Sequence, residues 1–183
     1  MCIRDRRLSI ITSKAQTTRH RILGIVNDKQ HQIVFSDTPG VMNPAYKLQE
    51  NMMDFVHGAF QDADILLYMV ETGEKQLKDE KLFERLKNTD LPILLLLNKI
   101  DRVEQDFVKE QILFWKELLP NAEIHPISAL NKFNLDLVMV RIKALLPLSP
   151  PYFEKDALTD KSERFFVSET IREKILKYLS LIH

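Results

Sequence analysis

Glycine is scarce in this sequence. Only four glycines, Gly24, Gly40, Gly58 and Gly73, occur among 183 residues, whereas about 7% of an average protein is glycine. The pattern G-x-x-x-x-G-K-[ST], whose backbone amides cradle nucleotide phosphates, does not occur among the 183 residues. A glycine-rich phosphate loop is therefore excluded from this chain.

Cysteine, long apolar runs and net charge are also lacking. The single cysteine, Cys2, excludes a disulfide partner within the chain and a thiolate metal cluster, and is typical of a reducing compartment. The longest apolar run, Ile93 to Leu97, is far shorter than the roughly 18–20 residues of a membrane span. Because 26 basic residues balance 26 acidic ones, a nucleic acid would have to bind a local patch.

The two ends of the chain resemble translated adapter DNA. Residues 1–6 (Met-Cys-Ile-Arg-Asp-Arg) and 179–183 (Leu-Ser-Leu-Ile-His) can be encoded by codons that are nearly reverse complements of each other. Protein termini have no physical reason for that relationship, whereas transposase adapters of sequencing libraries do. We therefore expect both segments to be adapter-derived scars, which are excluded from fold reasoning, and the natural chain to continue on both sides.

Strand and helix patterns alternate along the chain. Strands are expected at residues 21–26, 32–36, 65–70, 93–97 and 124–127. Four amphipathic stripes are expected to be core-facing helices: Leu48, Met52, Phe55 and Val56; Leu77, Leu82, Phe83 and Leu86; Phe107, Ile112, Trp115, Leu118 and Leu119; and Leu135, Val138, Ile142, Leu145 and Leu146. This alternation predicts an α/β fold with an open, mostly parallel sheet and helices on both faces, where ligands bind beyond the carboxyl ends of the strands.

A first polar motif, Asp37-Thr38-Pro39-Gly40, follows the strand expected at 32–36. A carboxylate at a strand end can hold Mg²⁺ through a water molecule, and a glycine lets its backbone amide approach a phosphate. Taken alone, the same tetrapeptide is equally well explained as a turn.

A second motif, Asn98-Lys99-Ile100-Asp101, follows the strand expected at 93–97. A carboxylate accepts paired hydrogen bonds from the N1–H and amine of guanine, which adenine cannot supply, while the lysine stem can lie along the base. The alternative is a helix N-terminus capped by Asp101. After the strand at 124–127, Ser128 and Ala129 could close over the base, although this dipeptide alone is nearly uninformative.

Three of the expected strands thus end in these motifs, and their order along the chain resembles that of translation-factor-like GTPases. Residues 13–21 (Ser-Lys-Ala-Gln-Thr-Thr-Arg-His-Arg) resemble the first switch segment of the Era family, and residues 164–169 and 171–175 (Arg-Phe-Phe-Val-Ser-Glu and Ile-Arg-Glu-Lys-Ile) resemble the start of its KH-type RNA-binding domain. The resemblance implies a P-loop NTPase-type G domain at residues 7–146, lacking its first strand, phosphate loop and first helix. A linker at 147–163 and the beginning of a KH-type α+β domain at 164–178 would follow.

The resemblance also implies residue roles. Thr18, with Thr17 as the runner-up, would reach Mg²⁺ when the γ-phosphate is bound, Asp37 would hold Mg²⁺ through water, and Gly40 would sense the γ-phosphate. The implied catalytic residues are Thr18 and Gly40, the metal residues are Thr18 and Asp37, and the nucleotide-binding residues are Asp37, Thr38, Pro39, Gly40, Asn98, Lys99, Asp101, Ser128 and Ala129. Val41 occupies the place of the water-positioning glutamine of Ras-like enzymes, which implies slow intrinsic hydrolysis.

The implied function is that of a ribosome-assembly factor which binds GTP and hydrolyses it to GDP and phosphate with Mg²⁺ as cofactor. Its implied partners are small-subunit ribosomal RNA and the small ribosomal subunit. The resemblance further implies a cytoplasmic monomer, with peripheral association on the cytoplasmic side of the membrane. RNA-binding residues stay unassigned because no G-x-x-G loop follows residue 164. Without a phosphate loop, we expect this chain to bind GTP poorly and to be inactive, with strands 33–36 and 65–70 left as open edges.

Two other functions fit parts of the pattern. A related GTPase of tRNA modification would share the nucleotide motifs but should not continue as an RNA-binding domain, and residues 164–177 argue against it. A non-catalytic scaffold could keep the base-reading loops and lack the phosphate loop.

Overall fold

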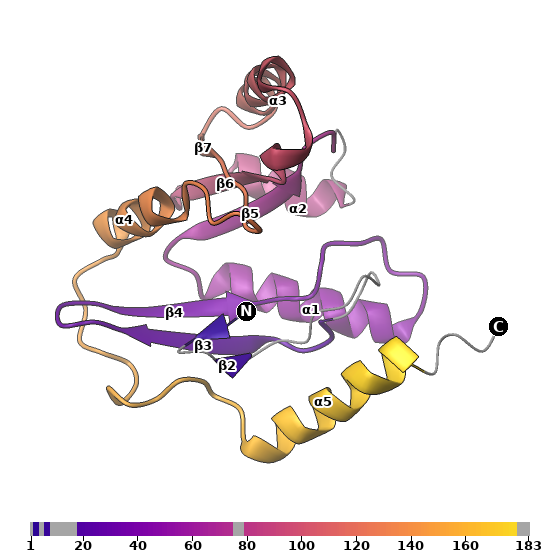
Figure 1. Ribbon diagram of the computed structural model, residues 1–183, viewed down its shortest axis with the longest axis vertical. Coiled ribbons are helices and arrows are strands. Elements are labelled where there is room, and N and C mark those ends of the chain that lie inside the picture. The colour runs from indigo at the N-terminus through magenta and orange to yellow at the C-terminus, as the bar shows by residue number, and fades with distance from the viewer. Residues whose placement is uncertain (1, 4–5, 8–17, 75–78, 179–183) are drawn as a thin grey trace. The chain divides into compact units, whose positions relative to one another are not determined.

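Figure 1 shows the computed structural model of the chain, which describes residues 2–3, 6–7, 18–74 and 79–178. The chain divides into two compact units, one formed by residues 1–61 and 149–183 and the other by residues 62–148. Thr17, Leu77 and most residues of the two expected adapter segments lie outside the described residues.

The described residues of the first unit form two short antiparallel sheets. β1 (Cys2–Ile3) pairs with β2 (Arg6–Arg7), and β3 (Ile22–Asn27) pairs with β4 (Gln32–Asp37) as a hairpin. The Asp28 carboxylate shapes the hairpin turn by accepting hydrogen bonds from the backbone amides of Gln30 and His31, at 2.8 and 2.7 Å. The strands predicted at 21–26 and 32–36 are confirmed to within one residue.

The helices that the structure describes in this unit are α1 (Lys47–Gln61) and α5 (Glu163–Tyr178). In α1 the side chains of Met52 and Val56 are buried, as predicted, but Leu48 and Phe55 are 42% and 38% exposed. The prediction that all four face the core is therefore wrong for two of them. The Phe55 ring lies edge-on to the ring of His20, with 6.0 Å between the two centroids.

The segment before α5 runs along the hairpin. The amide of Ile25 donates to the carbonyl of Leu158 at 2.9 Å, and the amide of Leu23 donates to Asp160 Oδ1 at 3.0 Å. Gln32 exchanges two hydrogen bonds of 2.9 Å with the backbone of Phe153. The stretch predicted as a linker is thus fixed to β3 and β4 over residues 153–160.

The second unit is built on a parallel sheet in the order β5 (Leu66–Glu71), β6 (Ile93–Asn98) and β7 (Ala122–Pro126). Its helices are α2 (Glu80–Lys87), α3 (Gln105–Leu118) and α4 (Leu135–Leu145). The strands predicted at 65–70 and 93–97 are confirmed, while the third begins two residues earlier than predicted. This parallel α/β arrangement confirms the predicted fold class.

Helices cover both faces of this sheet. The Tyr68 ring of β5 lies edge-on to the Trp115 ring of α3, with 6.2 Å between centroids, whereas Glu123 of β7 pairs with Arg141 of α4. Tyr68 aligns with Leu95 of β6 and Glu123 aligns with Leu94. Because neighbouring residues of a strand point to opposite faces, α3 and α4 lie on opposite sides of the sheet.

The core of the second unit is centred on β6. Its five residues from Ile93 to Leu97 are at most 5% exposed, as expected for a central strand buried on both faces. Helix residues that pack around it are also buried: Leu82 and Leu86 of α2, Trp115 and Leu119 at α3, and Val138 and Ile142 of α4. The predicted stripes are confirmed at these six positions, whereas seven other members are only half-buried: Phe83, Phe107, Ile112, Leu118, Leu135, Leu145 and Leu146.

The two strands that were expected to have open edges each pair on one side only. Among the described strands, β4 pairs with β3 alone and β5 pairs with β6 alone. Leu67 and Met69 of β5 are 40% and 56% exposed. Both strands predicted to have open edges are therefore edge strands here. Over the described residues, no helix has the length and apolar character needed to cross a membrane.

Candidate functional site

The carboxyl end of β6 leads into a tight turn. Lys99 adopts a left-handed backbone conformation, with φ of 66° and ψ of 31°, and a short 3-10 helix, η1 (Ile100–Arg102), follows it. This conformation is unfavourable for a non-glycine residue, and the amide of Arg102 stabilises it by donating to the Lys99 carbonyl at 3.1 Å. Asp101 lies inside η1, and the residue that precedes α3 as its cap is Glu104. The alternative that Asp101 is a helix N-cap is therefore wrong.

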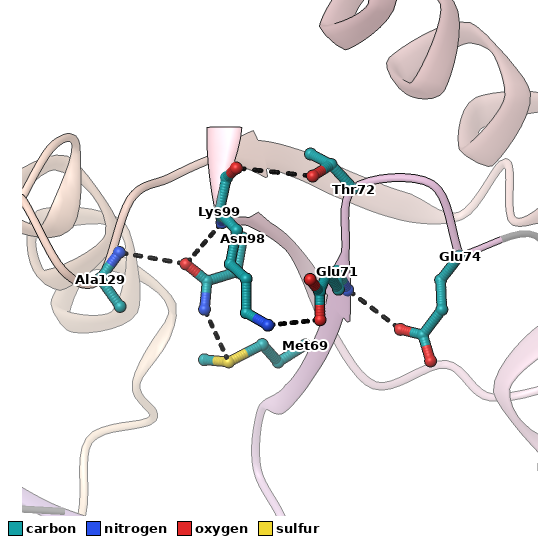
Figure 2. A network of polar contacts seen from close by, with 7 residues as sticks. All are labelled: Met69, Glu71, Thr72, Glu74, Asn98, Lys99 and Ala129. Carbon is teal, nitrogen blue, oxygen red and sulfur yellow. Dashed lines mark hydrogen bonds and ion pairs between the residues drawn. The ribbon is translucent and has the colours of Figure 1, made fainter. Parts of the chain in front are cut away.

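Asn98 joins this turn to the loop that follows β7. Its Oδ1 accepts hydrogen bonds from the backbone amides of Lys99, at 2.8 Å, and Ala129, at 3.0 Å, while its Nδ2 lies 3.6 Å from the Met69 sulfur (Figure 2). The carbonyl group of Asn98 is thus committed to the protein backbone. Within the described part of the chain, its amide nitrogen has only a weak sulfur acceptor and is the part of the side chain best placed to serve a ligand.

Asp101 and Ser128 make the second connection between the two loops. The Ser128 hydroxyl donates to Asp101 Oδ1 at 2.5 Å and accepts from the amide of Asn131 at 3.2 Å. Ser128 is only 1% exposed, whereas Asp101 is exposed and its Oδ2 has no partner among the described residues. The serine therefore orients a carboxylate that still presents acceptor capacity to a donor-rich ligand.

The ammonium group of Lys99 forms an ion pair with the carboxylate of Glu71 at the end of β5 (Figure 2). Glu71 was not among the residues selected from the sequence. A signal for it existed, because Glu71 directly follows the strand predicted at 65–70 as Asn98 follows the strand at 93–97. The register of the parallel sheet indeed aligns these two residues.

The other predicted residues belong to the first unit. Asp37 is the last residue of β4, Pro39 is buried, and Gly40 is exposed, with nothing within 4 Å of a Cβ built on it. Thr18 is half-buried before β3. The structure brings together five predicted residues in the second unit: Asn98, Lys99, Asp101, Ser128 and Ala129. Thr18 and the four residues 37–40 belong to the first unit.

The donor chemistry of Asp37 and Thr18 fits Mg²⁺, which prefers carboxylate and hydroxyl oxygens. No group of three or more His, Cys, Asp or Glu side chains that could hold a metal is present among the described residues. Mg²⁺ typically binds to one or two protein oxygens together with water and substrate phosphates. Asp37 and Thr18 match that kind of site rather than a cage made by the protein alone.

Charge pairing near the sheet shifts two titrations. The hydrogen bonds from the Arg141 guanidinium hold the pKa of Glu123 below its usual range, and the same contact raises the pKa of Arg141. Burial, followed by the charge of Glu74, raises the pKa of Tyr68 far above its usual value. The phenol of Tyr68 therefore stays neutral at the edge of the core.

A parallel sheet whose strands end in polar loops joined by side-chain hydrogen bonds is typical of α/β proteins that bind a ligand, such as a nucleotide, at the carboxyl ends of their strands. Residues 2–99, more than half of the sequence, match the family model of 50S ribosome-binding GTPases. The chain belongs to that family.

Individual relatives narrow the similarity to Era. The chain is 39% identical over 179 residues to the GTPase Era of Clostridium botulinum strain Langeland, covering 97% of this chain and 60% of the relative. It is 38% identical over 178 residues to the GTPase Era of a Thermoanaerobacter species, covering 97% and 59%. The chain thus spans about 60% of the length of these curated relatives. The resemblance to the Era family is confirmed.

Solved structures agree. A crystal structure of a variant of Aquifex aeolicus Era bound to GDP·AlF4⁻ matches with a TM-score of 0.86 at 34% identity, covering 93% of this chain and 59% of that one. The elongation factor SelB of Methanococcus maripaludis matches with a TM-score of 0.58 at 20% identity, covering 76% and 31%. The second likeness shows a shared fold alone.

Proposed function

We propose that this chain supplies the base-reading loops and the switch residues of an Era-like enzyme that binds GTP and hydrolyses it to GDP and phosphate. The observation that carries the proposal is the pair of loops at the ends of β6 and β7. Among the residues that the structure describes, their Asp101 carboxylate and Asn98 amide nitrogen face no strong partner other than the Ser128 hydroxyl. That arrangement accepts the N1–H and amine of guanine and donates to an acceptor atom of the base.

Preference for guanine follows from the chemistry of the Asp101 carboxylate. Adenine has no adjacent pair of ring and amine donors, so it would leave the carboxylate without its hydrogen bonds. Ala129, whose amide already donates to Asn98, and Lys99 complete the surface against which the base would lie. Ser128 acts by holding Asp101 rather than by touching the base.

We extend the proposal to the phosphate side from the donor chemistry and from the family. Asp37 and Thr18 would hold Mg²⁺ with water and phosphate oxygens, and the Gly40 amide would contact the γ-phosphate, with Thr38 and Pro39 shaping its approach. The open space beside Gly40 supports this role, because nothing in the protein itself fills the place of a Cβ. Mg²⁺ supplies charge stabilisation during phosphoryl transfer.

The family likeness alone supports a ribosomal role. We propose small-subunit ribosomal RNA as the partner of the whole protein, with α5 as the start of the RNA-binding part, and a monomer of the cytoplasm that associates peripherally with the membrane. Sedimentation of the whole protein with isolated small subunits, in GTP and in GDP, tests this partner. Equal sedimentation with large subunits would contradict it.

The base preference can be tested on the chain by NMR titration with GDP and ADP. We expect GDP to shift the amide signals of Asp101 and Ala129 with weak affinity, because no phosphate loop is present in the sequence, and ADP to leave them unchanged. Asp101→Asn keeps an acceptor for Ser128 but should lower GDP affinity at least about tenfold. The Asp101→Asn variant should instead prefer a xanthine nucleotide over GDP. Xanthine has a carbonyl where guanine has its amine, and that carbonyl can accept a hydrogen bond from the side-chain amide of the new asparagine.

Asp106→Asn is a matched control. It removes the same charge from an exposed aspartate at the start of α3, which forms an ion pair with Lys109. Because Asp106 is not part of the proposed base site, GDP affinity should not change. Equal shifts with ADP and GDP would contradict the proposal. Micromolar binding that depends on Mg²⁺ would contradict the expectation that this chain binds GTP poorly.

A further inference from the structure

We propose that Glu71 is a positioning residue of the base site. Its carboxylate holds the ammonium group of Lys99 before any nucleotide binds, so that the aliphatic stem of Lys99 is already laid out for stacking on the base. This inference rests on the proposed guanine-binding function and assigns a role to a residue outside the base-reading motifs.

The backbone around Lys99 is fixed from the side of β5. Glu71 aligns with Asn98 in the parallel register, and the amide of Thr72 donates to the Asn98 carbonyl at 3.0 Å. The Thr72 hydroxyl donates to the Lys99 carbonyl at 3.5 Å. The left-handed conformation of Lys99 therefore leaves its side chain beside the end of β5, where it meets the Glu71 carboxylate (Figure 2).

The position of Glu71 is itself defined by the turn after β5. Its amide donates to Glu74 Oε2 at 3.0 Å, and the amide of Glu74 donates to the Glu71 carbonyl at 3.0 Å. Gly73 permits this turn, because its φ of 90° is rarely adopted by other residues. Two acidic side chains thus lie close together, and of the two it is Glu71 that pairs with Lys99.

Prior ordering of a lysine favours ligand binding. A free lysine side chain has many rotamers, and fixing it against a base costs conformational entropy at the moment of binding. An ion pair that restricts Lys99 in the free protein shifts part of that cost to folding. Because the side chains of Lys99 and Glu71 are 39% and 48% exposed, water and salt weaken the pair, and we expect a modest effect of about three- to tenfold on nucleotide affinity.

The matched variants are Glu71→Gln and Glu74→Gln. Each removes one negative charge from the same turn and keeps an oxygen acceptor, but only the first removes the partner of Lys99. Glu71→Asp keeps the charge on a shorter side chain. Lys99→Met keeps an unbranched stem without the charge and identifies the ammonium signal of Lys99 by its absence.

Two measurements on the 183-residue chain test the inference. The first is the ¹⁵N signal of the Lys99 ammonium without nucleotide, which should be sharp in the unchanged chain and in Glu74→Gln and should be lost to exchange in Glu71→Gln. The second is GDP affinity by NMR titration, which should fall about three- to tenfold in Glu71→Gln at low salt, with partial recovery in Glu71→Asp. In a Lys99→Met background, Glu71→Gln should cause no further loss.

Each contrary outcome is distinct. If Glu71→Gln leaves the ammonium signal sharp, or leaves GDP affinity unchanged, the inference is wrong while the proposed function stands. If Glu74→Gln lowers affinity as much as Glu71→Gln, general charge rather than positioning is responsible. If the unchanged chain shows an ordered Lys99 but no shift with GDP, the proposed function fails and the base-site role of Glu71 fails with it. If Glu71→Gln does not fold, two other measurements decide the question. Glu71→Asp should bind GDP more weakly than the unchanged chain does. High salt should abolish the ammonium signal of Lys99 in the unchanged chain, and the inference is wrong if neither change occurs.

Discussion

Asn98 accepts a hydrogen bond from the backbone amide of Ala129, across 31 positions of sequence, at 3.0 Å. The two residues follow neighbouring parallel strands, and the same Asn98 oxygen also accepts from the amide of Lys99. The side chain therefore holds together the two loops that would surround a base. The residue proposed to donate to the base is thus also the one that ties the two loops together.

Replacement of Asn98 by alanine should destabilise the second unit. Asn98→Ala leaves the half-buried amide of Lys99 without its acceptor, and an unsatisfied buried group costs about 1–3 kcal/mol, whereas the exposed amide of Ala129 can bind water instead. Asn98→Asp keeps the acceptor oxygen and should cost less. Urea unfolding followed by the fluorescence of Trp115, the only tryptophan and fully buried in this unit, measures the free energy of unfolding. Equal losses for both variants would contradict this role.

Much of the second unit could be predicted from the sequence. The run from Ile93 to Leu97 is apolar at every position, and such a run is buried on both faces when it forms a central parallel strand. β7 was placed less well, because Ala122 and Glu123 carry no strand pattern of their own. Ala122 and Glu123 adopt strand structure because they pair with Ile93 and Leu94 of β6. This pairing depends on the tertiary fold and not on the local sequence.

The site was predicted in part for a similar reason. Asn98, Asp101 and Ser128 could be found because they follow strands, and the structure joins their loops. The Glu71–Lys99 pair depends on which strands are neighbours and on the parallel register, neither of which a local pattern contains. The contact of residues 153–160 with β3 was missed because proline-rich composition predicts only the lack of helix and strand.

The core around β6 should be sensitive to loss of volume. Leu95 is fully buried, and Leu95→Ala should lower the free energy of unfolding by about 2–5 kcal/mol, because the transfer energy and a cavity both contribute. Leu113→Ala is the control, since Leu113 on α3 is 64% exposed and should change stability by less than about 0.5 kcal/mol. Urea unfolding reports both. Similar losses would contradict the assigned core.

The Glu123–Arg141 pair should make stability depend on pH. The guanidinium of Arg141, with a smaller effect of His125, lowers the pKa of Glu123 in the folded protein. A carboxyl with a lowered folded-state pKa stabilises the fold above its unfolded-state pKa, and this stabilisation is lost as the pH falls through the folded-state value. The native chain should therefore have a higher urea midpoint than Glu123→Gln at pH 7.

The difference in urea midpoint between the native chain and Glu123→Gln should disappear at low pH. The loss should begin near the usual carboxyl pKa of 4.5 and be complete below the folded-state pKa of Glu123. The difference should also shrink in high salt, because the Glu123 side chain is 43% exposed. Glu110→Gln, which removes an exposed carboxylate from α3, should change the urea midpoint at pH 7 less than Glu123→Gln does. A constant difference between the native chain and Glu123→Gln from pH 7 to pH 2 would contradict the pairing.

Two glycine substitutions should have opposite signs. Gly73 has a φ of 90° and nothing within 4 Å of a Cβ, so Gly73→Ala introduces backbone strain without a clash and should destabilise the protein by about 1–2 kcal/mol. Gly58 lies inside α1 with equal free space, and Gly58→Ala should stabilise it by about 0.5–1 kcal/mol. Thermal unfolding followed by far-ultraviolet circular dichroism measures both. The added methyl group is the same and meets no atom in either place. If both substitutions stabilised the protein, or both destabilised it, backbone conformation would not be what decides the effect.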